Sequence, residues 1–152
     1  MFRESEKDRV NKLNACLAKI LSGMKPPEDL TVSQWADKNR RLTSESSAEV
    51  GKWRTSRTPY MFDILDSFTD PLIEHIVVVA ASQVGKSETI NNMVGYSIDQ
   101  DPGPILLIQP TIDDVKRYSE MRIAPMIRET RCLKRKVADP KSRDAANTKR
   151  QK

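Results

Sequence analysis

Apolar residues in the first part of the chain recur at helical spacing. Within residues 2–23 an apolar side chain returns every three or four positions among charged ones, which predicts an amphipathic helix. Gly23 and the Pro26-Pro27 pair predict where this helix ends, because neither residue type sustains a helix. The apolar stripe consists of Val10, Leu13, Leu17, Ile20 and Leu21.

A second, shorter helix is predicted around residues 30–41. Thr31, followed three positions later by Gln34, has the form of a capping box, in which each residue satisfies a backbone N–H group of the other. The helix that begins there should turn Trp35 into the core. The polar residues 43–58 show no sustained period, so they predict a loop with Trp53 as its one strong hydrophobic contact.

Thr58 and Pro59 then predict the start of another helix, because proline suits the first helical position. Asp70-Pro71 should end it. The residues expected on its buried face are Met61, Leu65 and Phe68.

The period changes after residue 75. Residues Ile76–Ala81 and Pro104–Gln109 are continuous apolar runs, as expected of strands buried on both faces of a parallel sheet. Residues 86–100 between them are long enough for one helix, so the segment predicts a βαβ unit with a right-handed crossover. Thr111 and Asp114 predict the N-terminus of a further helix that runs to Ala124, before Pro125 breaks or kinks it.

The junction between the first apolar run and the helix resembles a phosphate-binding loop. Glycines in G-x-x-x-x-G-K-[ST] let the backbone N–H groups point at a phosphate, the lysine reaches the β and γ phosphates, and the hydroxyl holds Mg²⁺. Ala80 stands where this pattern has its first glycine, which is a mild penalty if its φ stays negative. The alternative is a plain turn from strand to helix. The candidate nucleotide-binding residues are Ser82, Gln83, Val84, Gly85, Lys86, Ser87 and Glu88, with Lys86 as the catalytic cation and Ser87 as the metal ligand.

Charge and cysteine content change this picture only in part. The net charge of +5 is uneven, since thirteen Lys/Arg face four Asp/Glu from Lys116 onward. This basic end suits phosphate contact or a solvated, disordered tail.

Cys16 and Cys132 form no C-x-x-C pair, which argues against a zinc site and favours a reducing compartment. No apolar run is long enough to cross a bilayer, so a cytoplasmic protein is expected.

Several separated blocks between Thr31 and Thr130 resemble the large terminase subunit of lambda-type tailed phages. They occur in the family's order and cover about two thirds of the chain. The loop form S-Q-V-G-K-[ST]-E is similar to the family's own variant of the phosphate loop. Ala80, at the position of the first glycine, therefore resembles a family trait rather than a defect. The blocks are VSQWADKNRRL, GKWRTSRTPY, AASQVGKSE, PILLIQPT and RIAPMIRET.

The resemblance implies an ATP- and Mg²⁺-dependent motor that drives double-stranded DNA into a capsid, with a C-terminal nuclease. It also implies a small terminase subunit and a portal protein as partners, oligomerisation of the full-length form, and work in the host cytoplasm at the procapsid. Tyr60 lies where related motors contact adenine, although core packing is an equal alternative. The family's acidic catalytic strand and nuclease carboxylates have no counterpart here, so a fragment that binds ATP with little or no turnover is expected.

These observations predict an α/β fold, with a partial P-loop NTPase (RecA/ASCE-like) parallel sheet and flanking helices behind an N-terminal helical segment. The expected divisions are residues 1–58, 59–133 and a basic, disordered tail over 134–152. Asp113-Asp114 are expected to serve a helix N-terminus rather than a metal, and His75 to be a surface or strand-edge residue. Two other functions stay open: a non-enzymatic basic DNA-binding or interaction module with a vestigial loop, and a helicase-like P-loop ATPase.

Overall fold

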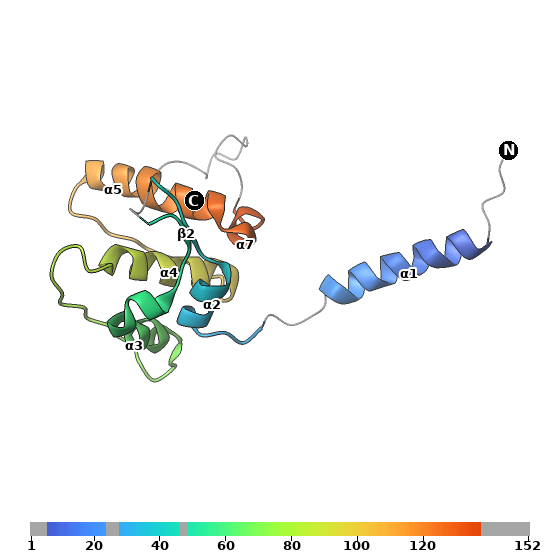
Figure 1. The fold of residues 1–152 in the computed structure, drawn as a ribbon, viewed down its shortest axis with the longest axis horizontal. Coiled ribbons are helices and arrows are strands. Elements are labelled where there is room, and N and C mark those ends of the chain that lie inside the picture. The colour runs from blue at the N-terminus through green and yellow to red at the C-terminus, as the bar shows by residue number, and fades with distance from the viewer. Residues whose placement is uncertain (1–5, 24–27, 46–48, 138–152) are drawn as a thin grey trace.

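Helices form most of the regular structure in a computed structural model that describes residues 6–23, 28–45 and 49–137 (Figure 1). Within these residues the only sheet is a two-stranded antiparallel hairpin, which pairs Arg41 with Lys52. The helices are α1 (Glu6–Gly23), α2 (Val32–Asn39), α3 (Phe62–Asp66), α4 (Lys86–Asp99), α5 (Ile112–Tyr118), α6 (Ala124–Glu129) and α7 (Arg131–Lys134). The strands are β1 (Arg41–Leu42) and β2 (Gly51–Lys52); the 3₁₀ turns are η1 (Thr55–Arg57), η2 (Pro59–Met61) and η3 (Ser67–Thr69).

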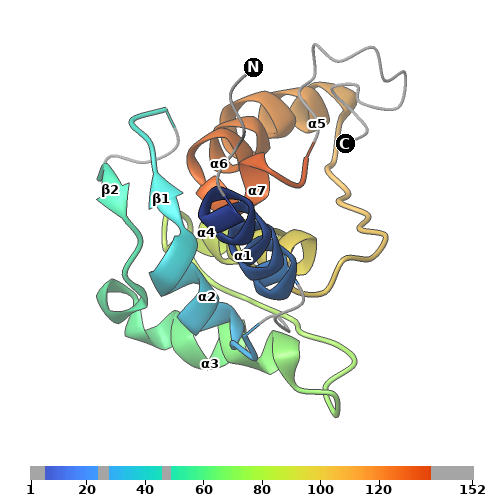
Figure 2. The same cartoon turned by 90° about the vertical axis from the view of Figure 1, so that its right-hand side faces the viewer.

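Helix α4 lies at the centre of the fold, with α2 and α3 on one side and α6 and α7 on the other (Figure 2). The core that joins these helices is small. Its buried members are Trp35, Ala36, Trp53, Met126 and Leu133. The predictions for Trp35 and Trp53 are therefore confirmed.

The predicted capping box fixes the start of α2. The Thr31 hydroxyl accepts a hydrogen bond from the Gln34 N–H, and the Gln34 side chain accepts one from the Thr31 N–H at 3.3 Å. The helix then directs Trp35 toward α4, where the indole N–H donates to a carboxylate oxygen of Asp99 at 2.8 Å. Both ends of this contact are buried, so α2 and α4 are fixed side by side.

The predicted helix after Thr58 has a different start. Thr58 has φ −128° and ψ 64° and forms no side-chain cap, and its buried hydroxyl has no partner among the described residues. The chain enters through the 3₁₀ turn η2 with Pro59 in its first turn, and only then forms α3. Met61 and Leu65 are buried as predicted, but Phe68 lies in η3, where it is 43% exposed and forms a T-shaped ring pair with Tyr96.

The two apolar runs predicted to be parallel strands lie outside any sheet in this structure. Several of their side chains are almost fully exposed, including Val77, Val79, Leu106 and Ile108. A strand is held by backbone hydrogen bonds to its neighbours, and the backbone of the described residues supplies none to either run. The helix predicted between the runs is confirmed as α4, while the parallel sheet and the crossover stay predictions.

The helical segment that begins with α5 continues beyond Pro125, where the sequence predicted a break or kink. The Thr111 hydroxyl accepts a hydrogen bond from the Asp114 N–H at 3.1 Å, which confirms the predicted cap. A π-helical turn, η4 (Ser119–Ile123), then joins α5 to α6, and Pro125 lies in the first turn of α6. We attribute the continuity to the wide turn, which changes the hydrogen-bond register just before the residue that has no N–H to donate.

The predicted division at residue 58 does not coincide with a break in packing, because Trp35 and Trp53 share one core with Met126 and Leu133. Helix α1 confirms the predicted N-terminal helix and lies apart from the other helices (Figure 1). The apolar residues of its stripe are 47–65% exposed. Residues 138–152, which include most of the predicted basic tail, lie outside the described residues.

Candidate functional site

The predicted phosphate loop connects residue 81 to α4 through a tight turn. Gly85 adopts φ 92° and Gln83 adopts φ 61°, both in the left-handed region that brings backbone N–H groups to one side. Of the described non-glycine residues only Gln83 has a positive φ, so Ala80 needs no glycine-like conformation. A Cβ atom placed on Gly85 would meet nothing within 4 Å, so the space beside Gly85 is open.

Lys86 closes this loop from its far end. Its ammonium group donates hydrogen bonds to the carbonyl oxygens of Ala80 at 2.7 Å and Ala81 at 2.8 Å. The lysine therefore lies back along the loop and holds its two ends together. The same three donors are available to phosphate oxygens, so a bound phosphate would exchange one set of acceptors for another.

Tyr60 lies beside the loop rather than in the core. Its hydroxyl donates to the carbonyl oxygen of Val84 at 3.1 Å, and 57% of the residue is exposed. This exposure contradicts the core-packing alternative. An exposed ring next to the phosphate loop suits contact with a nucleotide base.

Glu88 is buried behind the loop, although the sequence placed it among the nucleotide-binding residues. One carboxylate oxygen accepts from Arg40 at 2.7 Å. The other accepts from Asn91 at 3.1 Å and from Arg122 at 3.3 Å. Arg40 is itself only 1% exposed, and burial lowers its pKa although the neighbouring Glu88 and Tyr118 act to raise it. The Glu88 side chain thus fixes the first turn of α4 to the segment that follows α2.

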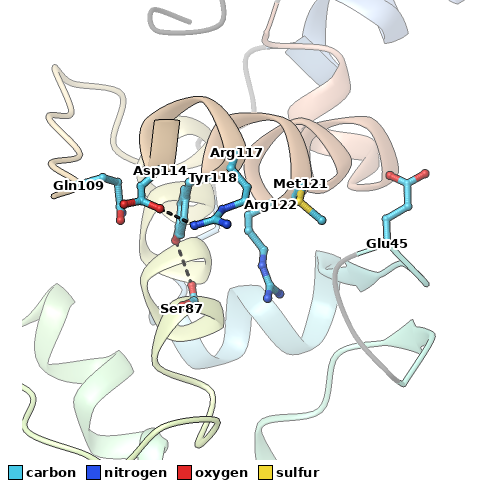
Figure 3. A pocket seen from close by; sticks show the side chains of 8 residues that line it. All are labelled: Glu45, Ser87, Gln109, Asp114, Arg117, Tyr118, Met121 and Arg122. Carbon is cyan, nitrogen blue, oxygen red and sulfur yellow. Dashed lines mark hydrogen bonds and ion pairs between the residues drawn. The ribbon is translucent and has the colours of Figure 1, made fainter. Parts of the chain in front are cut away.

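Ser87 borders a cavity of about 360 Å³ between the start of α4 and the helix α5 with its π-helical turn (Figure 3). Its lining includes Gln109, Asp114, Arg117, Tyr118 and Arg122. The Tyr118 hydroxyl donates to the Asn91 side chain at 2.8 Å and contacts the Ser87 carbonyl at 3.4 Å. Burial, with the nearby Glu88 charge, raises the pKa of Tyr118 to about 12, so it stays a neutral donor.

Asp113 and Asp114 occupy the first turn of α5, as the sequence predicted. The Asp114 carboxylate accepts from the Thr111 hydroxyl at 2.7 Å and from Arg117, and these two hydrogen bonds lower its pKa. His75 is exposed, in agreement with the prediction of a surface residue. The described part of the chain contains no cluster of three His, Cys, Asp or Glu residues suited to a metal ion, and no helix long and apolar enough to cross a membrane.

Sequence reasoning missed three residues of this site. Arg40, Tyr118 and Arg122 come from segments far from the loop motif, and no local pattern connects them to it. Arg40 and Arg122 each had one usable signal, because they lie inside the blocks VSQWADKNRRL and RIAPMIRET that resemble the terminase family. The buried contacts that unite the three residues exist only in the folded chain.

Comparisons with known proteins agree with the loop. Residues 47–152 match the family described as phage terminase large subunit gpA, ATPase domain. The chain is 28% identical over 121 residues to the terminase large subunit of Escherichia phage lambda, which covers 80% of this chain and 19% of the relative. It is 29% identical over 103 residues to the terminase large subunit of Enterobacteria phage P21, which covers 68% of this chain and 16% of the relative.

The chain thus spans less than a fifth of the length of these two relatives. No solved structure matches it. The family match covers well over half of the chain and includes the phosphate loop, all of α4 and the π-helical turn. On this evidence the chain belongs to the family of phage terminase large subunit gpA ATPase domains.

Proposed function

We propose that this chain is the ATP-binding part of a motor that packages double-stranded DNA into a phage capsid. The observation that carries the proposal is the loop before α4, where Gly85 and Gln83 turn the backbone inward and Lys86 holds the loop ends. The open space over Gly85 and the family match support it. The small terminase subunit, the portal protein and a full-length homo-oligomer are the corresponding proposed partners.

The proposed cofactor is ATP with Mg²⁺. The backbone N–H groups of the loop would bind the β phosphate and Lys86 the β and γ phosphates, while the exposed Ser87 offers a hydroxyl oxygen to the metal. A hard oxygen donor suits Mg²⁺, and phosphate oxygens and water would complete its shell. When bound, the metal neutralises negative charge on the phosphates. Tyr60 would stack against the base.

We also propose an α/β fold for the ATPase domain, with residues 75–81 and 104–109 as strands of one parallel sheet. Their exposed apolar side chains support this, because both faces of such strands are normally covered. Hydrogen exchange on a longer form that contains the whole ATPase domain would test it. Protection of the amides in both runs is expected, and rapid exchange throughout either run would contradict the proposal.

Titration calorimetry with Mg²⁺–ATP tests the nucleotide proposal. Lys86→Ala should abolish binding, because it removes the cation that reaches the terminal phosphates. Lys38→Ala is the matched control, since Lys38 is a half-exposed lysine at the end of α2 that pairs with Glu28. Equal affinities of the wild type and Lys86→Ala would refute nucleotide binding at this loop.

Tyr60 can be tested separately from the loop. Tyr60→Phe removes only the hydrogen bond to the Val84 carbonyl and keeps the ring, so it should retain ATP binding. Tyr60→Ala should weaken binding about tenfold, in line with the loss of roughly 1–3 kcal/mol of base stacking. Unchanged affinity in Tyr60→Ala would remove the residue from the base site.

A further inference from the structure

The phosphate-loop motif assigns no role to the cavity beside Ser87. Ser87 belongs both to the phosphate loop and to the lining of this cavity (Figure 3). If its hydroxyl holds the metal, as proposed above, the metal-bound end of the nucleotide lies next to the cavity. That end carries the β and γ phosphates, so the space beyond Ser87 is where a terminal phosphate would extend.

Two arginines line this space from the facing helical segment. Arg117 lies in the last turn of α5 and pairs with Asp114, and its side chain is 69% exposed. Arg122 lies in the π-helical turn, and its side chain is 39% exposed. In the close-up the Arg122 side chain extends away from the π-helical turn (Figure 3), and its guanidinium lies 3.3 Å from the Glu88 carboxylate of α4. Turns of this kind occur frequently at functional sites, because they redirect side chains out of the regular helical pattern.

Arg122 can move toward a phosphate without leaving a buried charge unpaired. Its contact with Glu88 is long, at 3.3 Å, and uses one carboxylate oxygen. Arg40 holds the other oxygen at 2.7 Å, and Asn91 donates to the oxygen that Arg122 shares. A guanidinium group also has five N–H donors, so it can keep one partner while it binds another.

The cavity also contains acidic groups that must be considered. Asp114 is paired with Arg117 and the Thr111 hydroxyl, and Glu45 pairs with Arg128 at 3.0 Å on the edge of the cavity. Both acids therefore already have cationic partners. A triphosphate would meet the two lining arginines together with its own metal ion, which compensates for these carboxylates.

We propose that this cavity receives the terminal phosphate of a nucleoside triphosphate and that Arg122 contacts it. The inference rests on the proposed nucleotide function and adds to it a residue that distinguishes a triphosphate from a diphosphate. A diphosphate would fill the loop and reach Lys86 but would leave the cavity empty. Arg122 should therefore strengthen the binding of ATP and leave the binding of ADP unchanged.

The test is a comparison of dissociation constants for Mg²⁺–ATP and Mg²⁺–ADP by titration calorimetry. The wild type should bind ATP about tenfold more tightly than ADP, the effect of a single hydrogen bond between charged groups. Arg122→Gln should reduce this ratio to about one and leave the ADP affinity unchanged. Arg131→Gln is the matched control, because Arg131 is an exposed arginine of α7 that does not line the cavity.

Each outcome separates this inference from the proposed function. If ATP and ADP bind the wild type equally and Lys86→Ala abolishes both, the loop function stands and the role of Arg122 is overturned. An unchanged ATP-to-ADP ratio in Arg122→Gln overturns it as well. Binding of neither nucleotide to the wild type removes the proposed function itself. If Arg122→Gln does not fold, a wild-type ratio of one still overturns the inference, since it contradicts a terminal-phosphate contact.

Discussion

The contact between Gly95 and Trp35 allows a demanding test of the core. A Cβ atom at Gly95 would lie 2.5 Å from Cη2 and 3.0 Å from Cζ3 of Trp35, and 3.5 Å from Leu133. The indole cannot easily yield, because Trp35 is fully buried and its N–H donates to Asp99 at 2.8 Å. Gly95→Ala should therefore force two packed helices apart.

The magnitude follows from two opposing effects. Alanine is favoured over glycine inside a helix by about 1 kcal/mol. Overpacking a close-packed core costs about 1–3 kcal/mol, and a weakened indole hydrogen bond adds about 1 kcal/mol. Taking the upper part of that range, because the clash involves a rigid ring, we expect Gly95→Ala to lower the free energy of unfolding by about 2 kcal/mol. With a urea dependence of about 2 kcal/mol per molar, the midpoint should fall by about 1 M.

Urea unfolding followed by circular dichroism measures this change. Gly103→Ala is the control, because a Cβ there meets nothing within 4 Å, and its effect should stay within about 0.5 kcal/mol. In a Trp35→Phe background the ring no longer extends to Gly95, so Gly95→Ala should become neutral or stabilising. A higher midpoint for Gly95→Ala in the wild type, or the same loss in both backgrounds, would refute the reasoning.

Three further predictions concern the buried polar groups. Arg40→Met should lower the free energy of unfolding by about 3 kcal/mol in urea unfolding, because Glu88 loses its shorter ion pair. Tyr118→Phe should cost about 1 kcal/mol, since Asn91 loses a donor. The pKa of Tyr118 is raised to about 12. The contribution of neutral Tyr118 to the free energy of unfolding is therefore complete below its ordinary pKa of 10.0 and is lost as the pH rises toward 12. Tyrosinate absorbance and unfolding, each measured against pH, would follow this loss. Burial raises the pKa of Asp99, but hydrogen bonds from Trp35, Lys136 and Gln100 outweigh burial and lower this pKa overall. The contribution of the Asp99 carboxylate to the free energy of unfolding is therefore present above its ordinary pKa of 3.8 and is lost at lower pH. Asp99→Asn should flatten the acid side of a stability–pH curve.

Distinct results would contradict these predictions. A stable Arg40→Met chain would mean that Arg122 and Asn91 satisfy Glu88 alone. Tyrosinate formation near pH 10 for all three tyrosines would mean that Tyr118 is not held as described. Equal acid sensitivity of Asp99→Asn and the wild type would assign the acid transition to other carboxylates.

Local sequence signals predicted the elements whose cause is local. The capping boxes and caps at Thr31 and Thr111, and the start of α4 at Lys86, each depend on residues within four positions. Thr58 failed as a cap because its backbone follows a 3₁₀ turn, which the sequence pattern does not distinguish from an α-helical start. Pro125 does not end the helix, and the π-helical turn before it leaves no signal in the sequence.

The residues of the candidate site also divide into those that the sequence indicated and those that it did not. The loop residues from Ser82 to Ser87 follow from their spacing, and the family resemblance indicated Tyr60. The contacts of Glu88 did not follow, because Arg40 and Arg122 reach it from 48 and 34 residues away. Long-range ion pairs require the fold to be known, so the motif predicted where a phosphate would bind but not what supports the loop.

The pairing of Arg40 with Glu88 has a practical consequence for dividing this protein. A shortened chain that begins at residue 59, where the sequence suggested that the ATPase core starts, would keep the whole phosphate loop. It would lose Arg40 and the indole of Trp35 together, so the carboxylate behind the loop and the face of α4 at Gly95 would both open to water. The loop is therefore not a portable unit, and a segment that precedes it by more than forty residues must be transferred with it.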